Sequence, residues 1–262
     1  GPEVTEAALI VLDAVNPDIE IVPCEAGYEW WLKSGGDTMI PPETWKILEE
    51  SDACLKAPTT TIPERWAPKS VPVSIRQKFD LYANVRPIKT FKGTTGRLGE
   101  VDFICVREAT EGLYSGIEYR LSDDVAIAVR KITARQSERV ARVAFEIARK
   151  RGWSKVIVVT KRNIMRECDG IFVEAVDRVS KSYPDISYEE YFIDNMAQQL
   201  VKNPQRFNQN VILGTNLFMD IISEEAAALV ASIGCIYSGN FGDSYAMFEP
   251  AHGSAPKYKG LY

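Results

Sequence analysis

Two acidic residues, Asp220 and Glu224, lie four positions apart in a segment whose pattern is typical of a helix. Residues at that spacing share one face of a helix, so both carboxylates can contact the same cation. Carboxylate oxygens are the ligands that Mg2+ and Mn2+ prefer, and substrate oxygens can complete the shell. Acid pairs at this spacing are also common on solvated helices, so the pattern alone leaves both readings open.

Three arginines form a second candidate group, because Arg76 and Arg86 are followed by Arg107. A guanidinium can bind a carboxylate through two parallel hydrogen bonds and stays charged at physiological pH. Arg86 and Arg107 lie in apolar, strand-like surroundings, where burial without an anionic partner would be costly. Several such groups converging would suit a substrate with several carboxylates, whereas each arginine alone is an ordinary surface charge.

A candidate proton carrier is Lys161, which directly follows the apolar run 156–160. It should emerge at the carboxyl end of a strand, where ligand sites gather in open α/β sheets. Near a metal ion and other cations, an ammonium group can exchange protons with a substrate hydroxyl. The alternative is a surface lysine at the start of a helix.

The elements that must position these residues alternate between strand-like and helix-like patterns, which predicts an α/β architecture with a largely parallel sheet. The expected strands cover 19–24, 53–57, 81–91, 101–107, 155–160, 188–193 and 211–213. The expected helices cover 42–50, 163–183, 196–201 and 218–231, with one more near the N-terminus and one that ends at Gly152. No repeat or low-complexity linker marks a domain boundary.

Composition restricts the class of protein. The 262 residues are 45% hydrophobic and 26% charged, which is typical of a soluble globular protein. A formal charge of −5 argues against general binding to nucleic acid or anionic membranes. No apolar run approaches the roughly 20 residues that span a bilayer, and the first residues show no basic region followed by an apolar core, so we do not expect secretion. Five scattered cysteines and a single histidine fit reduced thiols in the cytoplasm better than a zinc site.

Several separated motifs occur in one order along the chain: 108–118 with Tyr-Ser-Gly-Ile-Glu, Lys-Arg-Asn at 161–163, Asp-Asn-Met at 194–196, the segment 216–224, and His-Gly-Ser-Ala-Pro at 252–256. Together they resemble the isocitrate/isopropylmalate dehydrogenase family over essentially the whole chain. The resemblance implies a large α/β domain from 1–81 and 231–262, and a smaller dimerisation domain from 82–230. It also implies a homodimer with shared active sites, and a chain truncated at both ends.

The same resemblance assigns roles to individual residues. Tyr114 and Lys161 would be catalytic, with the lysine acting in the partner subunit's site. Asp194 would be a third metal ligand, donated across the dimer interface. Met219 and Glu224 stand where the family usually has Gly and Asp, so Asp220 is the firmer metal ligand. The substrate-binding residues would be Ser70, Arg76, Arg86 and Arg107, and the cofactor-binding residues would be Thr61, Asn163, Glu249, His252, Gly253, Ser254, Ala255, Lys257 and Tyr258.

We therefore expect metal-dependent oxidative decarboxylation of isocitrate to 2-oxoglutarate with reduction of NADP. Lys257 and Tyr258 resemble NADP-preferring members, with NAD as the alternative. Ser70 and the Tyr-Ser-Gly-Ile-Glu segment favour isocitrate as the substrate, whereas Pro72 stands where isocitrate enzymes often carry Asn. The alternatives are 3-isopropylmalate, homoisocitrate or tartrate as substrate, or a non-catalytic regulatory subunit.

Overall fold

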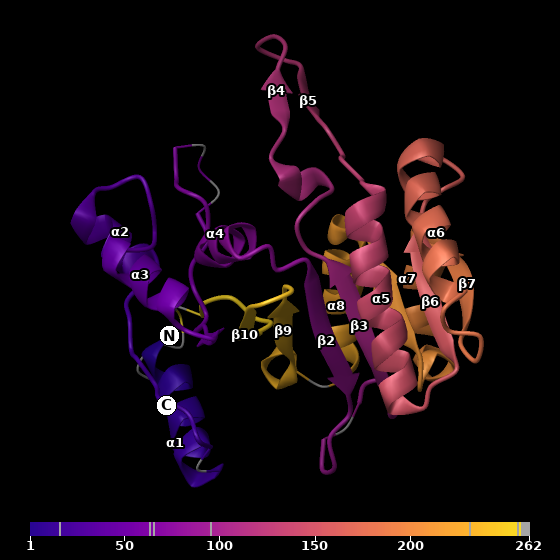
Figure 1. Cartoon of the computed structure of the whole chain (residues 1–262), viewed down its shortest axis with the longest axis horizontal. Coiled ribbons are helices and arrows are strands. Elements are labelled where there is room, and N and C mark those ends of the chain that lie inside the picture. The colour runs from indigo at the N-terminus through magenta and orange to yellow at the C-terminus, as the bar shows by residue number, and fades with distance from the viewer. Residues whose placement is uncertain are drawn as a thin grey trace.

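The protein has an α/β fold built on one large mixed sheet (Figure 1). The computed structural model describes residues 1–15, 17–62, 64, 66–94, 96–230, 232–255 and 257. Within those residues the main sheet has eight strands in the order β1-β10-β9-β2-β3-β8-β6-β7. Its strands are β1 Ala53–Leu55, β2 Ala83–Lys89, β3 Asp102–Glu108, β6 Lys155–Thr160, β7 Ser187–Phe192, β8 Val211–Gly214, β9 Tyr237–Phe241 and β10 Ala246–Pro250.

Strand direction changes across the sheet. The pairs β3–β8, β8–β6, β6–β7 and β1–β10 are parallel, whereas β2 runs antiparallel to both β3 and β9. The expectation of a parallel sheet therefore holds for β3, β8, β6 and β7, and the middle of the sheet departs from it. Because those four strands run the same way, their carboxyl ends lie along one edge, where ligand sites form in such sheets.

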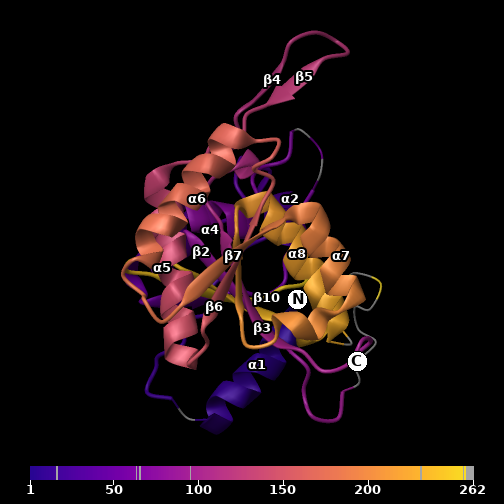
Figure 2. The same cartoon turned by 90° about the vertical axis from the view of Figure 1, so that its right-hand side faces the viewer.

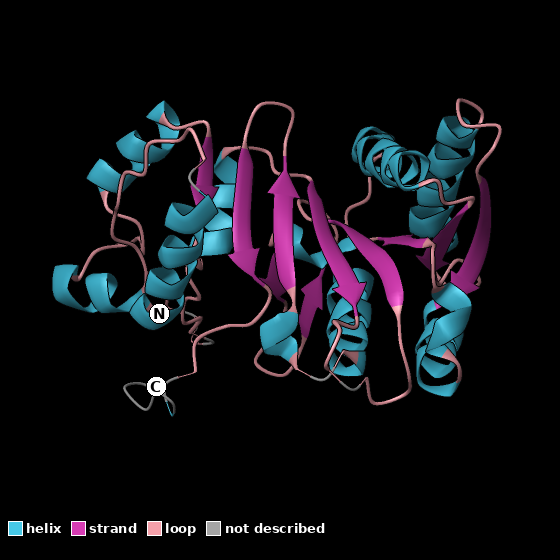
Figure 3. Ribbon diagram, turned by 90° about the horizontal axis from the view of Figure 1, so that it is seen from below, coloured by secondary structure: helices cyan, strands magenta, loops and turns pink. Residues whose placement is uncertain are grey.

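Helices cover both faces of the parallel part of the sheet (Figures 2 and 3). Alternate strand residues point to opposite faces, so Val156 and Val158 pack with α5 and α6 while Ile157 and Val159 pack with α7 and α8. This arrangement explains why β6 reads as a continuous apolar run. The helices are α1 Pro2–Val15, α2 Tyr28–Ser34, α3 Pro42–Glu50, α4 Val71–Lys78, α5 Ala134–Arg151, α6 Arg166–Ser180, α7 Ile193–Lys202 and α8 Asn216–Leu229.

A separate apolar cluster lies under α2, α3 and α4, and it includes Trp31, Ile40, Leu81 and Met247. Its buried members fall within 1–81 and 231–262, whereas the other two clusters draw mainly on 82–230. The main sheet nevertheless runs without interruption between these parts, because β2 pairs with β9. The division into a large and a small domain stays a prediction.

Two expectations near the N-terminus were not met. Residues 19–24 form no strand, and Ile19, Ile21 and Val22 are exposed. Their apolar pattern resembles a strand, but a strand also needs a neighbour that pairs with its backbone, and no pairing involves this segment in the described part of the chain. The strand expected at 53–57 is shorter, and its residues Ala53 and Leu55 are exposed rather than buried.

Other boundaries were predicted well. Helix α5 ends at Arg151, and Gly152 adopts the left-handed conformation with φ of 69° and donates to the carbonyls of Ala148 and Arg149. Strand β6 has the predicted bounds, Lys155–Thr160. Among the described residues, no helix combines the length and apolar character that crossing a membrane requires.

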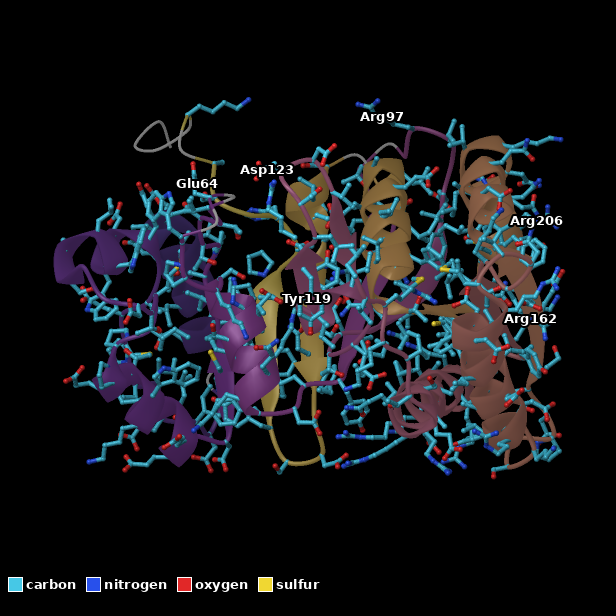
Figure 4. The ribbon with its side chains drawn as sticks, turned by 90° about the horizontal axis from the view of Figure 1, so that it is seen from above. Glu64, Arg97, Tyr119, Asp123, Arg162 and Arg206 are labelled. Atoms are coloured by element: carbon cyan, nitrogen blue, oxygen red, sulfur yellow. The ribbon has the colours of Figure 1, made fainter. Side chains whose placement is uncertain are left out.

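A two-stranded hairpin, β4 Glu118–Arg120 and β5 Ala126–Ala128, projects from the body of the molecule (Figures 1 and 2). Its residues Tyr119, Leu121 and Ile127 are exposed, so the hairpin carries apolar side chains into solvent. Figure 4 looks along the hairpin, with Tyr119 and Asp123 over the middle of the sheet and Arg162 at the outer edge.

Candidate active site

The densest charged group lies where β3 and β8 end and α8 begins. Arg107, near the end of β3, donates from Nε to Oδ1 of Asn216, the first residue of α8, at 2.8 Å. Its Nη1 donates to Oδ1 of Asp220, one helical turn further along. Tyr114, in the short 3-10 helix η1 Leu113–Ser115, donates its hydroxyl to Oδ2 of the same carboxylate. Asp220 thus joins a predicted substrate arginine to the predicted catalytic tyrosine.

Arg86 reaches the same helix from β2. Its Nη1 donates to Glu224 Oε1 at 2.7 Å and to Ser223 Oγ at 2.9 Å, and its Nη2 lies 3.7 Å from Asp220 Oδ1. Arg86, Arg107, Tyr114, Asp220 and Glu224 are called the arginine–acid cluster below. The helical spacing of the two acids predicted that they share a face, and the structure puts both against buried arginines.

Burial sets the electrostatics of the arginine–acid cluster. Arg107 is 3% exposed, and burial lowers its pKa to about 10 although Asp220 opposes the shift. The guanidinium therefore keeps its charge at neutral pH. Burial and the hydrogen bond to Asp220 both raise the pKa of Tyr114, so the tyrosine keeps its proton at neutral pH and remains a donor.

Arg76 lies in a polar chain that continues from this cluster. Its Nε donates to Asn240 Oδ1 at 2.9 Å, and its Nη2 lies 2.7 Å from Glu249 Oε1. Asn84 donates to the same Asn240 oxygen at 2.8 Å and accepts from Arg86 at 2.9 Å. Two buried asparagines thus connect Arg76 to Arg86.

Glu249, predicted to bind cofactor, lies between two cations. Lys56 Nζ is 3.1 Å from its Oε2, and Arg76 holds its Oε1. Burial disfavours the carboxylate, but Arg76 and Lys56 outweigh that effect and lower the pKa of Glu249 to about 2. Ser70, predicted to bind substrate, precedes α4, and the last turn of that helix carries Arg76.

The other predicted catalytic residue lies apart from the arginine–acid cluster. Lys161, directly after β6, places its Nζ 2.5 Å from Oδ1 of Asp194 in the first turn of α7. This lysine–aspartate pair is accessible, with the Asp194 side chain 68% exposed and that of Lys161 25% exposed. The hydrogen bond from Lys161 lowers the pKa of Asp194. Asn163 follows in the exposed turn after β6.

A hard cation fits the oxygen donors of this edge. Among the described residues, no three His, Cys, Asp or Glu side chains of one chain are placed to hold a metal ion. Asp220 and Glu224 present carboxylate oxygens from one face of α8, with side chains 31% and 41% exposed. This all-oxygen set suits Mg2+ or Mn2+ once further oxygens are supplied from outside the chain. Asp194 is not near enough to complete it within one chain.

The residues predicted to bind the adenine nucleotide meet in part. Thr60 and Ser254 share a hydrogen bond of 2.7 Å, which joins the segments 57–62 and 251–255. Thr61 and Ala255 are exposed beside them, and His252 contacts the carbonyl of Gly253 through Nδ1 at 2.9 Å. Lys257 is exposed, whereas Pro256 and Tyr258 lie outside the described residues.

The sequence-based prediction missed the asparagines that organise the arginines: Asn84, Asn216 and Asn240. A signal existed for Asn84, because an amide inside the apolar run 81–88 must find hydrogen-bond partners if the strand is buried. It also missed Asp169 and Arg130, whose contact spans separate segments and leaves no local pattern.

Comparisons with known proteins agree on one family. The family model described as isocitrate/isopropylmalate dehydrogenase matches residues 1–262. The chain is 38% identical over 260 residues to 3-isopropylmalate dehydrogenase of Methanothermobacter thermautotrophicus, covering 99% of this chain and 76% of that protein. It is 39% identical to NADP isocitrate dehydrogenase of Thermus thermophilus, covering 99% of this chain and 52% of that protein. The crystal structure of isocitrate dehydrogenase from Methylococcus capsulatus superposes with a TM-score of 0.93 at 37% identity, covering all of this chain and 77% of that one.

Proposed function

This chain belongs to the isocitrate/isopropylmalate dehydrogenase family, and on that premise we propose that it oxidises and decarboxylates isocitrate with reduction of NADP. One observation carries the proposal. Two buried arginines, Arg86 and Arg107, meet on Asp220, and buried asparagines link them to Arg76. Fixed, buried guanidinium groups of this kind suit a small substrate with several carboxylates.

Asp220 and Glu224 would hold a divalent metal ion, with Asp194 supplied by a second copy of the chain. Bound there, Mg2+ or Mn2+ would polarise the hydroxyl and adjacent carboxylate of the substrate. The arginines would orient the carboxylates, so that the hydroxyl carbon faces the nicotinamide. The neutral amine of Lys161, its own proton having been given up first, would accept the hydroxyl proton, and Tyr114, which keeps its own proton at neutral pH, would donate at the carbon that loses CO2.

A shared site across a homodimer would bring the lysine–aspartate pair to the arginine–acid cluster. Exposed apolar residues lie near the pair, with Phe192 beside Lys161 and Ile164 three residues after it, and Ile221 is exposed on α8. Together with the apolar hairpin they offer a surface that suits another copy of the chain. The pair itself contacts solvent on one side, so a second subunit can approach it.

The choice of substrate rests on Ser70. Ser70 directly precedes α4, the helix that carries Arg76 in its last turn, and its hydroxyl suits one more carboxylate rather than the aliphatic side chain of 3-isopropylmalate. That second candidate is supported by the 38% identity to a 3-isopropylmalate dehydrogenase, which is close to the 39% for isocitrate dehydrogenase. The preference for NADP rests on the cation Lys257, which suits a 2′-phosphate.

Cofactor reduction by the protein in its full natural length, with Mn2+ present, tests the proposal. Isocitrate, 3-isopropylmalate and homoisocitrate would each be offered with NADP and with NAD. Turnover confined to isocitrate and NADP supports the assignment, and Lys257→Glu should then shift the preference toward NAD. Turnover with 3-isopropylmalate alone would contradict the proposed substrate. If no combination gives cofactor reduction although the protein is a folded dimer that binds Mn2+, tartrate as substrate or a regulatory role would be favoured.

A further inference from the structure

An ion pair between the buried Asp169 and the partly buried Arg130 lies beside Lys161 and takes no part in the chemistry proposed above. Asp169, in the first turn of α6, is fully buried. Its Oδ2 accepts the backbone N–H of Lys161 at 2.6 Å, and its Oδ1 accepts from Nη2 of Arg130 at 2.6 Å. The carboxylate therefore holds the main chain of the lysine rather than its side chain.

Arg130 extends this contact to the helix that carries the predicted metal ligands. Its Nη2 also donates to Oγ1 of Thr215 at 2.9 Å, and its guanidinium lies 5.2 Å from the ring centre of Phe218. Thr215 directly precedes α8, and its hydroxyl makes no capping bond to that helix. The threonine instead accepts from Arg130, so the arginine fixes the start of α8.

The backbone of Lys161 is held on both sides. Its N–H is bound by Asp169, and its carbonyl accepts from the amides of Ile164 and Met165 at 2.9 Å each. The side chain of Lys161 extends from this anchored point to the exposed Asp194 of the same chain. A small displacement of the anchor would therefore move the ammonium directly.

Stability alone does not account for this pair. Charges in a protein interior lose their hydration, and replacing a buried ion pair by apolar residues is often neutral or stabilising. Arg130 is not even fully satisfied, because its Nη1 is buried without a hydrogen-bond partner in the described part of the chain. What the pair does provide is a rigid connection from the end of β6 to the start of α8.

We propose that Asp169 and Arg130 are positioning residues that fix Lys161 relative to helix α8. The inference rests on the proposed function, in which Lys161 acts as a base and α8 carries Asp220. In a shared-site dimer the connection has a further consequence. Lys161 of each chain would serve one active site, while Asp220 and Glu224 of the same chain would serve the other. The connection therefore links the positions of the catalytic groups in the two sites.

The test compares Asp169→Asn and Arg130→Lys with Asp177→Asn, an exposed control on the same helix α6. Misplacing a catalytic group by about 1 Å can slow a reaction by on the order of 10²-fold. We expect Asp169→Asn to lower kcat by roughly that factor. The substrate KM should change by less than about twofold, because Arg86 and Arg107, the proposed substrate-binding arginines, are not altered. Arg130→Lys should retain an intermediate kcat, and the control should match the wild type.

A double-mutant cycle separates positioning from general damage. In a Lys161→Met background, Asp169→Asn should lower the residual kcat no further, because the lysine it positions is gone. The proposal would be overturned if Asp169→Asn lowered kcat equally in the wild-type and Lys161→Met backgrounds. It would also be overturned if every fall in kcat were accompanied by a matching fall in thermal stability. Arg130→Lys serves the same cycle if Asp169→Asn does not fold.

A second measurement does not depend on turnover. Hydrogen–deuterium exchange of the peptide that contains Lys161 should speed up about tenfold in Asp169→Asn, since the asparagine is uncharged and has one acceptor oxygen for two donors, the Lys161 amide and Arg130. The peptide at the start of α8 should follow, and exchange in β7 should not change. Unchanged exchange at Lys161 would refute the positioning role even if turnover is seen. Altered exchange in a protein that oxidises none of the substrates would leave the connection intact and refute the proposed function instead.

Discussion

The arginine–acid cluster and the lysine–aspartate pair lie on the same edge of the sheet, yet they are built differently. The cluster is packed around buried guanidinium groups, each with several acceptors within the chain. The pair is a single exposed contact at the outer strands, between Lys161 and Asp194. The cluster is therefore held rigidly by contacts within its own chain, whereas the pair is accessible to a group outside its chain.

The difference separates two kinds of functional residue. A buried charge must be hydrogen-bonded wherever it lies, so changing it affects both folding and activity. An exposed ion pair contributes little to stability because water and salt screen it. If both regions take part in the reaction, a substitution in the arginine–acid cluster should lower both stability and turnover. A substitution in the lysine–aspartate pair should lower turnover alone.

The largest expected effect is at Lys161. Lys161→Met should lower kcat about 10³-fold, because the base for the hydroxyl proton is removed. The thermal midpoint should stay within a few degrees of the wild type, because the ion pair is exposed. Steady-state kinetics and a thermal melt of the same preparation measure both. The matched control is Lys155→Met at the other end of β6, where the ion pair with Glu189 is also exposed. A normal kcat in Lys161→Met would contradict the role of the lysine.

Arg107→Gln should lower both the free energy of unfolding and kcat/KM. Asp220 and Asn216 lose their shared donor, so the free energy of unfolding should fall by about 2 kcal/mol. The value of kcat/KM should fall by about 10²-fold, mainly through KM, because a substrate carboxylate loses its partner. Urea denaturation and substrate titration give the two numbers. Arg178→Gln, which removes an exposed ion pair to Glu138, should change neither. If Arg107→Gln lost activity but kept its stability, the arginine–acid cluster would behave like the lysine–aspartate pair, and the proposed difference between them would be wrong.

A smaller effect concerns acid stability. The pKa of Glu249 lies near 2 in the fold, against 4.5 for an ordinary glutamate. A depressed carboxyl pKa stabilises the fold above the ordinary value and loses that contribution as the pH falls from about 4.5 toward 2. The stability difference between the wild type and Glu249→Gln should therefore shrink by up to about 3 kcal/mol over that range. Urea denaturation at a series of pH values measures it, with the exposed Glu189→Gln as control. A difference independent of pH would mean that Arg76 and Lys56 do not hold an ionised Glu249.

Local pattern predicted much of this architecture. The apolar run predicted β6, the glycine predicted where α5 ends, and the spacing of Asp220 and Glu224 predicted that both acids share one face of their helix. The strand expected at 19–24 failed because strand formation depends on a neighbour that local pattern does not describe. Motif order predicted the site residues, which stay a prediction, and the burial of Arg86 and Arg107 agrees with their apolar neighbours in the sequence.

Contacts between distant segments could not be predicted in this way. Asn240 and Asn84 are 156 positions apart, and Arg130 reaches Thr215 across 85 positions. Such contacts depend on the order of strands in the sheet, which no local pattern encodes. For the same reason the sequence did not reveal that Glu249 lies between Arg76 and Lys56.

Subunit complementation tests most directly the claim that the two regions act together across two chains. Lys161→Met and Asp220→Asn would each be prepared as an inactive protein, then mixed under conditions that let subunits exchange. If the site is shared, random reassociation leaves about a quarter of all sites with an intact lysine and an intact acid, so about a quarter of wild-type activity should return. If mixed dimers form and no activity returns, the lysine and the acid serve the same chain, and the account of a shared site is wrong.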